Sequence, residues 1–90
     1  MAVAFIFEVP GLSQAQYEAV VREANAGQPS AGVLLHLAGP SESGWRIIDV
    51  WESEAAATTF YGSEAFQQAV QRNNVAAGQP TIWPLHVLQQ

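Results

Sequence analysis

Residues 44–52 have the sequence GWRIIDVWE, which contains two of the three tryptophans and the only aspartate of the chain. In a β-strand, successive side chains point to opposite faces. Alternation puts Trp45, Ile47, Asp49 and Trp51 on one face and Arg46, Ile48, Val50 and Glu52 on the other. Both faces are largely apolar, so we expect a strand that is covered on both sides. The carboxylate stands on the aromatic face, away from the nearest arginine, so its partner must come from another strand.

Three further stretches predict strands around this segment. They are Ala2–Val9, Gly32–Ala38 and residues 81–88, each apolar and bounded by turn residues. The turn cluster GPSESG, residues 39–44, joins the second strand to the third as a hairpin. Pro84 cannot donate a hydrogen bond to a neighbouring strand, so we expect the last strand to be an edge strand or to carry a bulge.

Two helices are predicted between the strands. The first begins at Ser13, where Gln16 completes a capping box. It carries an apolar stripe of Tyr17, Val20, Val21 and Ala24. The second begins after Ser53 as its N-cap, and Ser63 directly after Gly62 indicates a fresh cap that interrupts it. The order β-α-β-β-α-β predicts a ferredoxin-like α+β sandwich, a four-stranded antiparallel sheet with two helices on one face.

Length and charge limit the class of protein. Residues 1–90 are expected to form a single domain. Three arginines, no lysine and a net charge of −5 argue against binding to nucleic acid or to an anionic membrane surface. There is no cysteine for a disulfide or a thiolate, and the apolar run at the N-terminus is too short to span a bilayer. We therefore expect a cytoplasmic protein.

The strands are apolar on both faces, which is unusual for a sheet with helices on one side only. Such a sheet normally alternates apolar and polar residues, with the polar ones on its open face. On the second strand, Val33, Leu35 and Leu37 oppose Leu34, His36 and Ala38. Only 12% of the residues are charged, against about 25% in typical domains. We expect two copies to pack sheet to sheet as a homodimer; a monomer with an unusually apolar surface is the alternative.

The element order, the length and the segment HLAGPSESGWRIIDVWES, residues 36–53, resemble the dimeric α+β barrel superfamily. More narrowly, the chain is similar to the small stand-alone proteins grouped with antibiotic-biosynthesis monooxygenases. The resemblance implies that two sheets form a shared barrel and that pockets lie between each sheet and its own helices. Members include cofactor-free oxygenases, cyclases, isomerases, haem-binding enzymes and proteins without known activity. The resemblance therefore implies fold and assembly more strongly than a reaction.

His36 and Asp49 are the candidate catalytic residues. If SESG is the hairpin loop, Pro40 pairs with Trp45 and His36 lies directly opposite Asp49. A six-residue loop would instead place His36 opposite Ile47, with Asp49 diagonal to it. Both registers keep the pair on one face, whereas a slip by one residue would separate them. A carboxylate beside an imidazole orients the ring and prepares it as a general base or acid. A satisfied polar pair without catalytic role is the alternative.

Aromatic residues are expected to wall a pocket beside this pair. The candidates for substrate binding are Tyr17, Trp45, Trp51, Phe60, Tyr61 and His86. Such walls suit a planar ligand, for example a phenol or a polyketide fragment, although each residue could also be ordinary core or dimer packing. Two histidines without clustered carboxylates predict no zinc or iron site. No basic pair is placed for haem propionates and no nucleotide-binding loop is recognisable, so we expect no cofactor.

Two classes of function remain open from the sequence. The first is an enzyme, a cofactor-independent monooxygenase, cyclase or isomerase that acts on a small apolar or aromatic molecule, with His36 as the base and Asp49 as its orienting partner. The second is a non-catalytic dimer that binds such a ligand or serves as a structural or interaction module. An open pocket that reaches His36 argues against a pure interaction module, and a closed, dry core around His36 argues against both an enzyme and a ligand-binding dimer.

Overall fold

The computed structural model describes residues 2–25, 31–75 and 78–86 of the chain. Within these ranges the elements are β1 (Val3–Pro10), α1 (Gln14–Asn25), β2 (Val33–Pro40), β3 (Gly44–Trp51), α2 (Glu54–Tyr61), α3 (Glu64–Arg72) and β4 (Thr81–Pro84). The predicted order is confirmed, with two short helices in place of the second long one. None of these helices is both long and apolar enough to cross a membrane.

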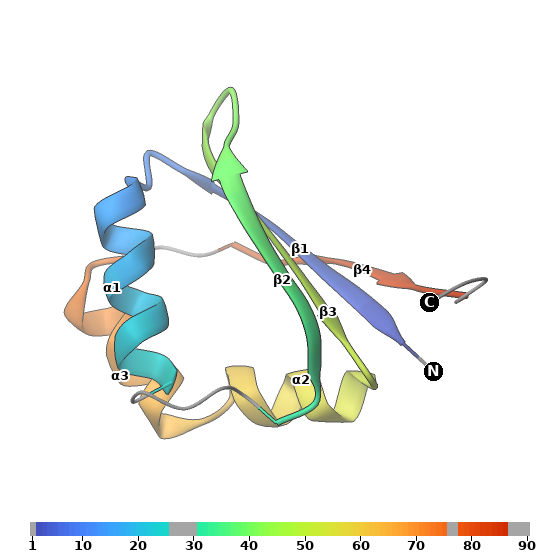
Figure 1. Cartoon of the computed structure of the whole chain (residues 1–90). Helices are drawn as coiled ribbons and strands as arrows, with labels where there is room; N and C mark the ends of the chain where they lie inside the picture. The colour runs from blue at the N-terminus through green and yellow to red at the C-terminus, as the bar shows by residue number, and fades with distance from the viewer. Residues whose placement is uncertain (1, 26–30, 76–77, 87–90) are drawn as a thin grey trace.

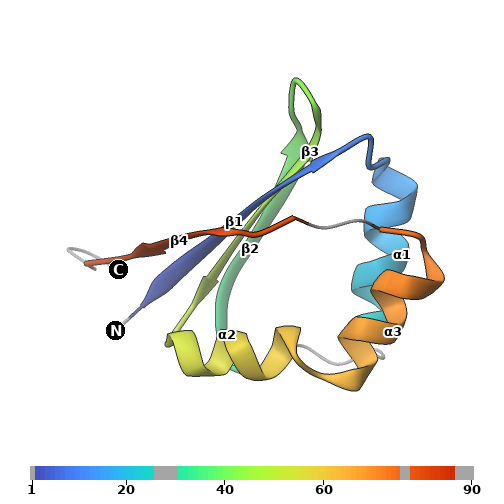
Figure 2. The same ribbon diagram turned by 180° about the vertical axis from the view of Figure 1, so that it is seen from behind.

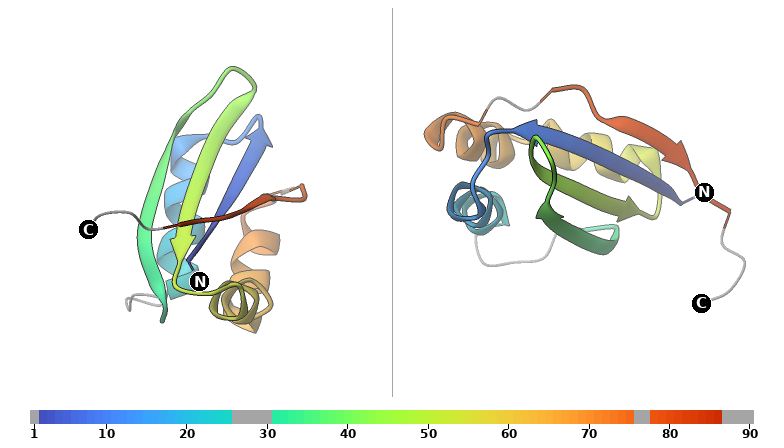
Figure 3. Two further views of the ribbon diagram at one scale, coloured as in Figure 1. Left: turned by 90° about the vertical axis from the view of Figure 1, so that its right-hand side faces the viewer. Right: turned by 90° about the horizontal axis from the view of Figure 1, so that it is seen from above.

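The four strands form one antiparallel sheet in the order β2-β3-β1-β4. The central neighbours β1 and β3 are separated in sequence by α1 and β2, which is the ferredoxin-like arrangement. The helices lie on one side of the sheet, with α1 and α3 side by side and α2 across the end of β3 (Figure 1). Figure 2 shows the same arrangement from behind, and Figure 3 shows how strongly the sheet twists.

Serine caps set the start of each helix, as predicted. Ser13 and Gln16 form the reciprocal capping box, with distances of 3.1 Å for both backbone N–H bonds. The Ser53 hydroxyl accepts from the backbone N–H of Ala56 at 3.1 Å, and the Ser63 hydroxyl accepts from that of Phe66 at 3.2 Å. Each cap satisfies an N–H group that lacks a partner within its helix. The second cap therefore divides the predicted helix into α2 and α3.

A β-bulge in β2 corrects one part of the predicted alternation. Val33 was expected to share a face with Leu35 and Leu37. The register shifts between Val33 and Leu35, so that Val33 pairs with Trp51 and points to the helix side of the sheet with His36. An extra residue in one strand of a pair reverses the facing of everything beyond it. The bulge thus adds a valine to the inner face without moving His36.

The last strand is shorter than predicted. β4 ends at Pro84, and its four residues pair with the start of β1 at one edge of the sheet. The prediction of an edge strand is confirmed. The predicted extension through residues 87 and 88 lies outside the described residues, and His86 follows the strand as an exposed residue.

The tight core lies between the sheet and α2. Val3, Phe5, Trp51 and Ala57 are its buried members, and Trp51 is the most deeply buried large side chain, with 1% of its surface exposed. Phe60 and Tyr61 of α2 pack against the Trp51 ring with centroid distances of 5.4 and 5.6 Å. These contacts fix α2 against β3. The pair α1 and α3 is joined by polar contacts, including Arg72 to Glu23 at 2.5 Å.

The outer face of the sheet carries apolar residues in two rows that cross all four strands. The pairings place Leu35, Val50, Ala4 and Trp83 in one row and Leu37, Ile48 and Ile6 in the next, which ends at the polar Thr81 on the edge strand. Leu35, Leu37 and Trp83 expose 51%, 49% and 60% of their surface. Arg46 and Glu8 form an ion pair on the same face, near the hairpin. The polar open face that an isolated sheet would need is therefore missing.

Two glycines of the hairpin give a matched test of its packing. A Cβ on Gly44 would lie 2.5 Å from both the backbone N of Gly11 and the backbone O of Val9, whereas a Cβ on Gly39 would meet nothing within 4 Å. Backbone atoms cannot move aside as a side chain can. We expect Gly44→Ala to lower the free energy of unfolding by about 2 kcal/mol or more and Gly39→Ala to change it little. Urea denaturation would measure both, and equal effects would contradict the close approach.

Candidate functional site

A cavity of about 270 Å³ lies between the inner face of the sheet and the helices. Its walls are mainly aliphatic and aromatic, and they come from β1, β2, β3 and all three helices. The lining residues are Phe7, Val9, Leu12, Tyr17, Val20, Val21, Ala24, Val33, His36, Ile47, Asp49, Trp51, Phe60, Tyr61, Phe66, Val70 and Val75. The predicted stripe of α1 therefore faces the cavity. So does the sheet face that carries His36 and Asp49.

The His36 and Asp49 side chains meet across the hairpin. The two residues pair directly in the β2–β3 register, as the four-residue loop predicts, and Nδ1 of His36 contacts Oδ1 of Asp49. Asp49 is 5% exposed, whereas 40% of the His36 side chain is exposed. Arg46 lies on the other face, where it binds Glu8. The partner of the lone aspartate is thus the histidine of the neighbouring strand.

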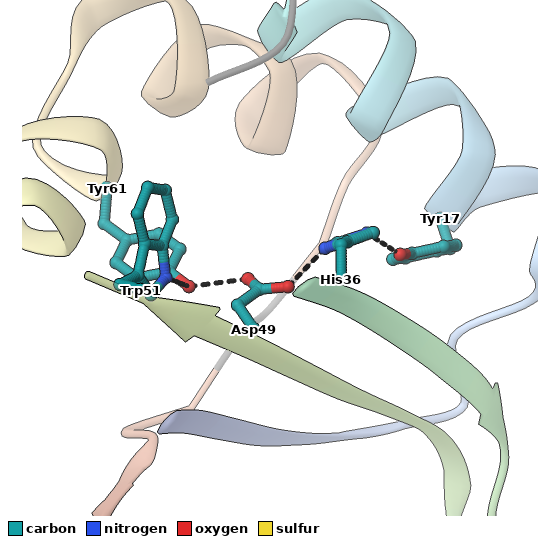
Figure 4. A network of polar contacts seen from close by, with 5 residues as sticks. All are labelled: Tyr17, His36, Asp49, Trp51 and Tyr61. Atoms are coloured by element: carbon teal, nitrogen blue, oxygen red, sulfur yellow. Dashed lines mark hydrogen bonds and ion pairs between the residues drawn. The ribbon is translucent and has the colours of Figure 1, made fainter. Parts of the chain in front are cut away.

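The second carboxylate oxygen of Asp49 is held from α2. The Tyr61 hydroxyl donates to Oδ2 of Asp49 at 2.6 Å, and it accepts the indole N–H of Trp51 at 3.0 Å (Figure 4). Tyr61 is the last residue of α2, and Trp51 is the last of β3. The short connection between these two elements therefore brings both side chains back to the same carboxylate.

Tyr17 occupies the other side of the histidine ring. Its hydroxyl contacts Nε2 of His36, and the two rings lie nearly parallel, with centroids 5.7 Å apart and planes inclined by 8°. Trp45 packs against the Tyr17 ring with a centroid distance of 5.6 Å. Five side chains from α1, β2, β3 and α2 thus form one continuous line of polar contacts (Figure 4).

The line of contacts fixes the proton on each group. An indole nitrogen can only donate, so the Tyr61 hydroxyl must accept from Trp51 and use its own proton for Asp49. An ionised carboxylate can only accept, so Nδ1 of His36 carries a hydrogen. In the neutral ring, Nε2 then carries the free lone pair, and the Tyr17 hydroxyl donates a hydrogen bond to it. The proton acceptor of the site is therefore Nε2 of His36.

The electrostatics follow from Asp49 and from burial. The hydrogen bond to Asp49 raises the pKa of His36, and burial opposes this rise. Burial, with the charge of Asp49, raises the pKa of Tyr17 to about 12. Burial, the charge of Asp49 and the hydrogen bond to it raise the pKa of Tyr61 well above its ordinary range. Both tyrosines thus keep their protons at neutral pH, and His36 is the group that changes charge most readily.

Six of the eight predicted site residues border the cavity. They are His36, Asp49, Tyr17, Trp51, Phe60 and Tyr61. Trp45 stands behind Tyr17 instead, and its indole N–H is buried without a hydrogen-bond partner among the described residues. His86 is exposed and follows β4, so it does not border the cavity. In both cases the strand pattern predicted the position of the residue along the chain but not how deeply its side chain is buried.

Several lining residues were not predicted as part of the site. Phe66 and Val70 of α3, Phe7 of β1 and Val75 after α3 all border the cavity. Phe66 packs on Phe60 and Tyr61 at centroid distances of 5.2 and 5.4 Å. Their spacing in the sequence is that of ordinary core residues. They line a cavity only because α3 does not pack tightly against the sheet. Among the described residues, no three His, Asp or Glu side chains gather as metal ligands.

The chain matches no protein-family model and no curated protein. Solved structures share its fold. A Chloroflexus aurantiacus protein, described as a candidate antibiotic biosynthesis monooxygenase, is 16% identical, with a TM-score of 0.69 and coverage of 99% of this chain and 98% of its own. A mutant of SnoaB, a cofactor-independent oxygenase from Streptomyces nogalater, is 16% identical and has a TM-score of 0.69. The match covers 99% of this chain and 98% of the SnoaB chain.

A third solved structure comes from Deinococcus radiodurans and is also described as a candidate antibiotic biosynthesis monooxygenase. It is 18% identical, has a TM-score of 0.67 and covers 100% of this chain and 97% of its own. At these identities the likeness shows the fold. The chain thus has the fold of the antibiotic-biosynthesis-monooxygenase-like proteins, as the resemblance of residues 36–53 predicts.

The His36–Asp49 contact predicts a specific dependence of stability on pH. Because the pKa of His36 is raised above its ordinary 6.5, the pair stabilises the folded state fully below about pH 6.5. This contribution is lost as the pH rises through the pKa of the folded state. Asp49→Asn keeps an acceptor for Nδ1 but removes the charge, so the pKa of His36 should fall and this pH dependence should shrink.

An NMR titration of the His36 ring, combined with urea denaturation at several pH values, would measure both effects. The same titration curve in the wild type and in Asp49→Asn would contradict the coupling. A ring that never titrates while the protein stays folded would show that protons do not reach Nε2.

Proposed function

We propose that this protein is a cofactor-independent oxygenase that acts on a small, neutral aromatic molecule. The observation that carries the proposal is a histidine with one nitrogen held by a buried carboxylate and the other at the wall of an apolar cavity. A general base needs this arrangement, because the carboxylate orients the ring and favours the cation that forms. Support from the comparisons is the fold shared with SnoaB, a cofactor-independent oxygenase.

The charges around the cavity favour a neutral ligand. None of the three arginines borders it: Arg46 binds Glu8 on the outer face, Arg72 binds Glu23 on the helices, and Arg22 is exposed. A carboxylate or phosphate group would thus enter without an arginine partner and beside the carboxylate of Asp49, which disfavours it. The volume of about 270 Å³ is near the lower end for ligand pockets. A molecule of two or three fused rings with one hydrogen-bonding group suits this space.

The proposed reaction starts with proton transfer to His36. Nε2 takes a proton from a phenolic hydroxyl, or from a CH₂ group made acidic by conjugation to the ring. The Tyr17 hydroxyl fills that position in this structure, so the substrate must take its place. The substrate anion gives one electron to O₂, and the two radicals combine to form a C–O bond. Protonation gives a hydroperoxide, which loses water to leave a carbonyl, so that CH₂ and O₂ become C=O and H₂O.

A non-catalytic ligand-binding protein is the second candidate. The observation in its favour is that the polar side chains already form hydrogen bonds with one another. The Tyr17 hydroxyl contacts Nε2 of His36, and the Tyr61 hydroxyl donates to Oδ2 of Asp49. Buried polar groups are generally paired for stability alone. The cavity would then bind an apolar molecule without chemistry.

Oxygen uptake with anthrone separates the two candidates. Anthrone is a neutral tricyclic ketone whose enol is a phenol, and its oxygenation gives anthraquinone and water. We expect turnover by the wild type and a loss of about 10²–10⁴-fold in kcat for His36→Gln. Binding of 1-naphthol, followed by quenching of tryptophan fluorescence, serves as the control for an intact cavity. Binding of both compounds without oxygen uptake would favour the second candidate, and no binding would contradict both.

We also propose that two copies of the chain pack through the outer faces of their sheets. The support is the two apolar rows across the strands, in which Leu35, Leu37 and Trp83 are about half exposed or more. Burial of a leucine side chain contributes about 1.5–3 kcal/mol when complete, so covering half of each leucine contributes about 1 kcal/mol per residue. A second copy offers the same apolar rows and is the simplest partner for them.

Light scattering of a charged variant tests this assembly. Leu37→Glu places a carboxylate in the middle of the apolar rows, and we expect it to convert a dimer into a monomer. Gln71→Glu adds the same charge at an exposed position of α3 and should leave the dimer intact. A monomeric wild type, or a Leu37→Glu variant that remains a dimer, would contradict the proposed interface.

A further inference from the structure

The buried carboxylate of Asp49 is held at both of its oxygens. Oδ1 contacts Nδ1 of His36, and Oδ2 accepts the Tyr61 hydroxyl at 2.6 Å. Asp49 is 5% exposed, so water contributes little to its solvation. A carboxylate in such a place depends on its hydrogen-bond donors for the stability of its charge. Tyr61 is therefore more than a wall of the cavity.

The Tyr61 hydroxyl has little freedom to point elsewhere. Trp51, which is 1% exposed, donates its indole N–H to the Tyr61 oxygen at 3.0 Å. The Tyr61 ring is also enclosed by other rings, with centroid distances of 5.2 to 5.6 Å to Phe5, Phe7, Trp51, Phe60 and Phe66. The amide of Gln67 donates to the backbone carbonyl of Tyr61 at 2.7 Å, which fixes the end of α2.

We propose that Tyr61, anchored by Trp51, is a positioning residue: its hydroxyl holds the Asp49 carboxylate turned toward His36 and shares its negative charge. The catalytic meaning of this role rests on the proposed function, in which His36 is the base. The role itself concerns only how Asp49 acts on His36. It is therefore open to measurement whether or not the protein turns over a substrate.

The direction of the effect follows from the charges around His36. Asp49 faces the ring from β3, Tyr17 faces it from α1, and Tyr61 of α2 acts through Asp49. A donor on Oδ2 draws negative charge away from Oδ1, which weakens the attraction between the carboxylate and the imidazolium. Tyr61 thus keeps His36 from becoming too strong a base.

The experiment compares Tyr61→Phe with Phe60→Leu by NMR titration of the His36 ring and by the ¹⁵N shifts that report its tautomer. Tyr61→Phe keeps the ring in the aromatic cluster and removes only the hydroxyl. We expect the His36 midpoint to move to higher pH and the preference for the Nδ1–H form to strengthen, because Oδ1 regains the negative charge that Tyr61 drew away. Phe60→Leu disturbs the same cluster but removes no hydrogen bond, and it should move both readouts much less than Tyr61→Phe does. Equal titrations of Tyr61→Phe and the wild type would overturn the proposal.

A second variant covers the case in which Tyr61→Phe fails to fold, since it leaves the Trp51 N–H unpaired. Tyr61→Phe combined with Trp51→Phe removes both polar groups and leaves no orphaned donor. The same rise of the His36 midpoint is expected, and its absence would overturn the role of Tyr61.

Activity with anthrone then separates this proposal from the proposed function. Where the wild type turns over, the acid limb of the rate profile should move with the His36 midpoint in Tyr61→Phe. A shifted midpoint in a protein that consumes no oxygen would sink the oxygenase and leave the positioning role in place. Oxygen uptake by the wild type, together with an unchanged His36 midpoint in Tyr61→Phe, would support the oxygenase and overturn the positioning role of Tyr61.

Discussion

The register of the β2–β3 hairpin is the constraint on which the candidate site depends. Ser41 and Gly44 exchange both backbone hydrogen bonds, at 3.0 and 3.3 Å, and so fix every pairing further along the two strands. His36 meets Asp49 only because the four residue pairs between the turn and this pair keep that register. A slip by one residue would turn one member of the pair to the outer face. The close approach of Gly44 to the backbone at Gly11 makes such a slip costly, since a residue with a Cβ would clash with the backbone there.

The two sides of the sheet are covered in different ways. Trp51 and α2 form a tight core at one end of the inner face, while α1 and α3 stand off far enough to leave a cavity beside it. This arrangement puts Phe60 and Tyr61 of α2 between the core and the cavity. They pack against the core on one side and line the cavity on the other. None of the described helices covers the outer face (Figure 1), and the Arg46–Glu8 ion pair lies near the hairpin, so the apolar rows are left without a cover.

Much of the fold was predictable because it depends on local rules. Serine caps, turn residues and the period of two in the strands located nearly every element. The four-residue hairpin loop, one of the two loops considered, placed His36 opposite Asp49. The bulge at Leu34 was not predictable, because nothing in VLLHLA marks which residue is left unpaired. The contact of Tyr61 with Asp49 and the depth of Trp45 were also beyond the pattern, since both depend on how far a helix stands from the sheet. No periodicity encodes that distance.

The chain of hydrogen bonds from Tyr17 to Trp51 can exchange a proton at its histidine but not at its tryptophan end. An indole N–H does not ionise at ordinary pH, so Trp51 can hold the line but cannot carry a proton out of it. Nε2 of His36 is then the single place where a proton enters or leaves. In the proposed reaction, a proton that the ring takes up at Nε2 has to leave from the same nitrogen, because Nδ1 stays bound to Asp49. In the proposed reaction, the base would thus be restored at the cavity, without a proton pathway through the interior of the protein.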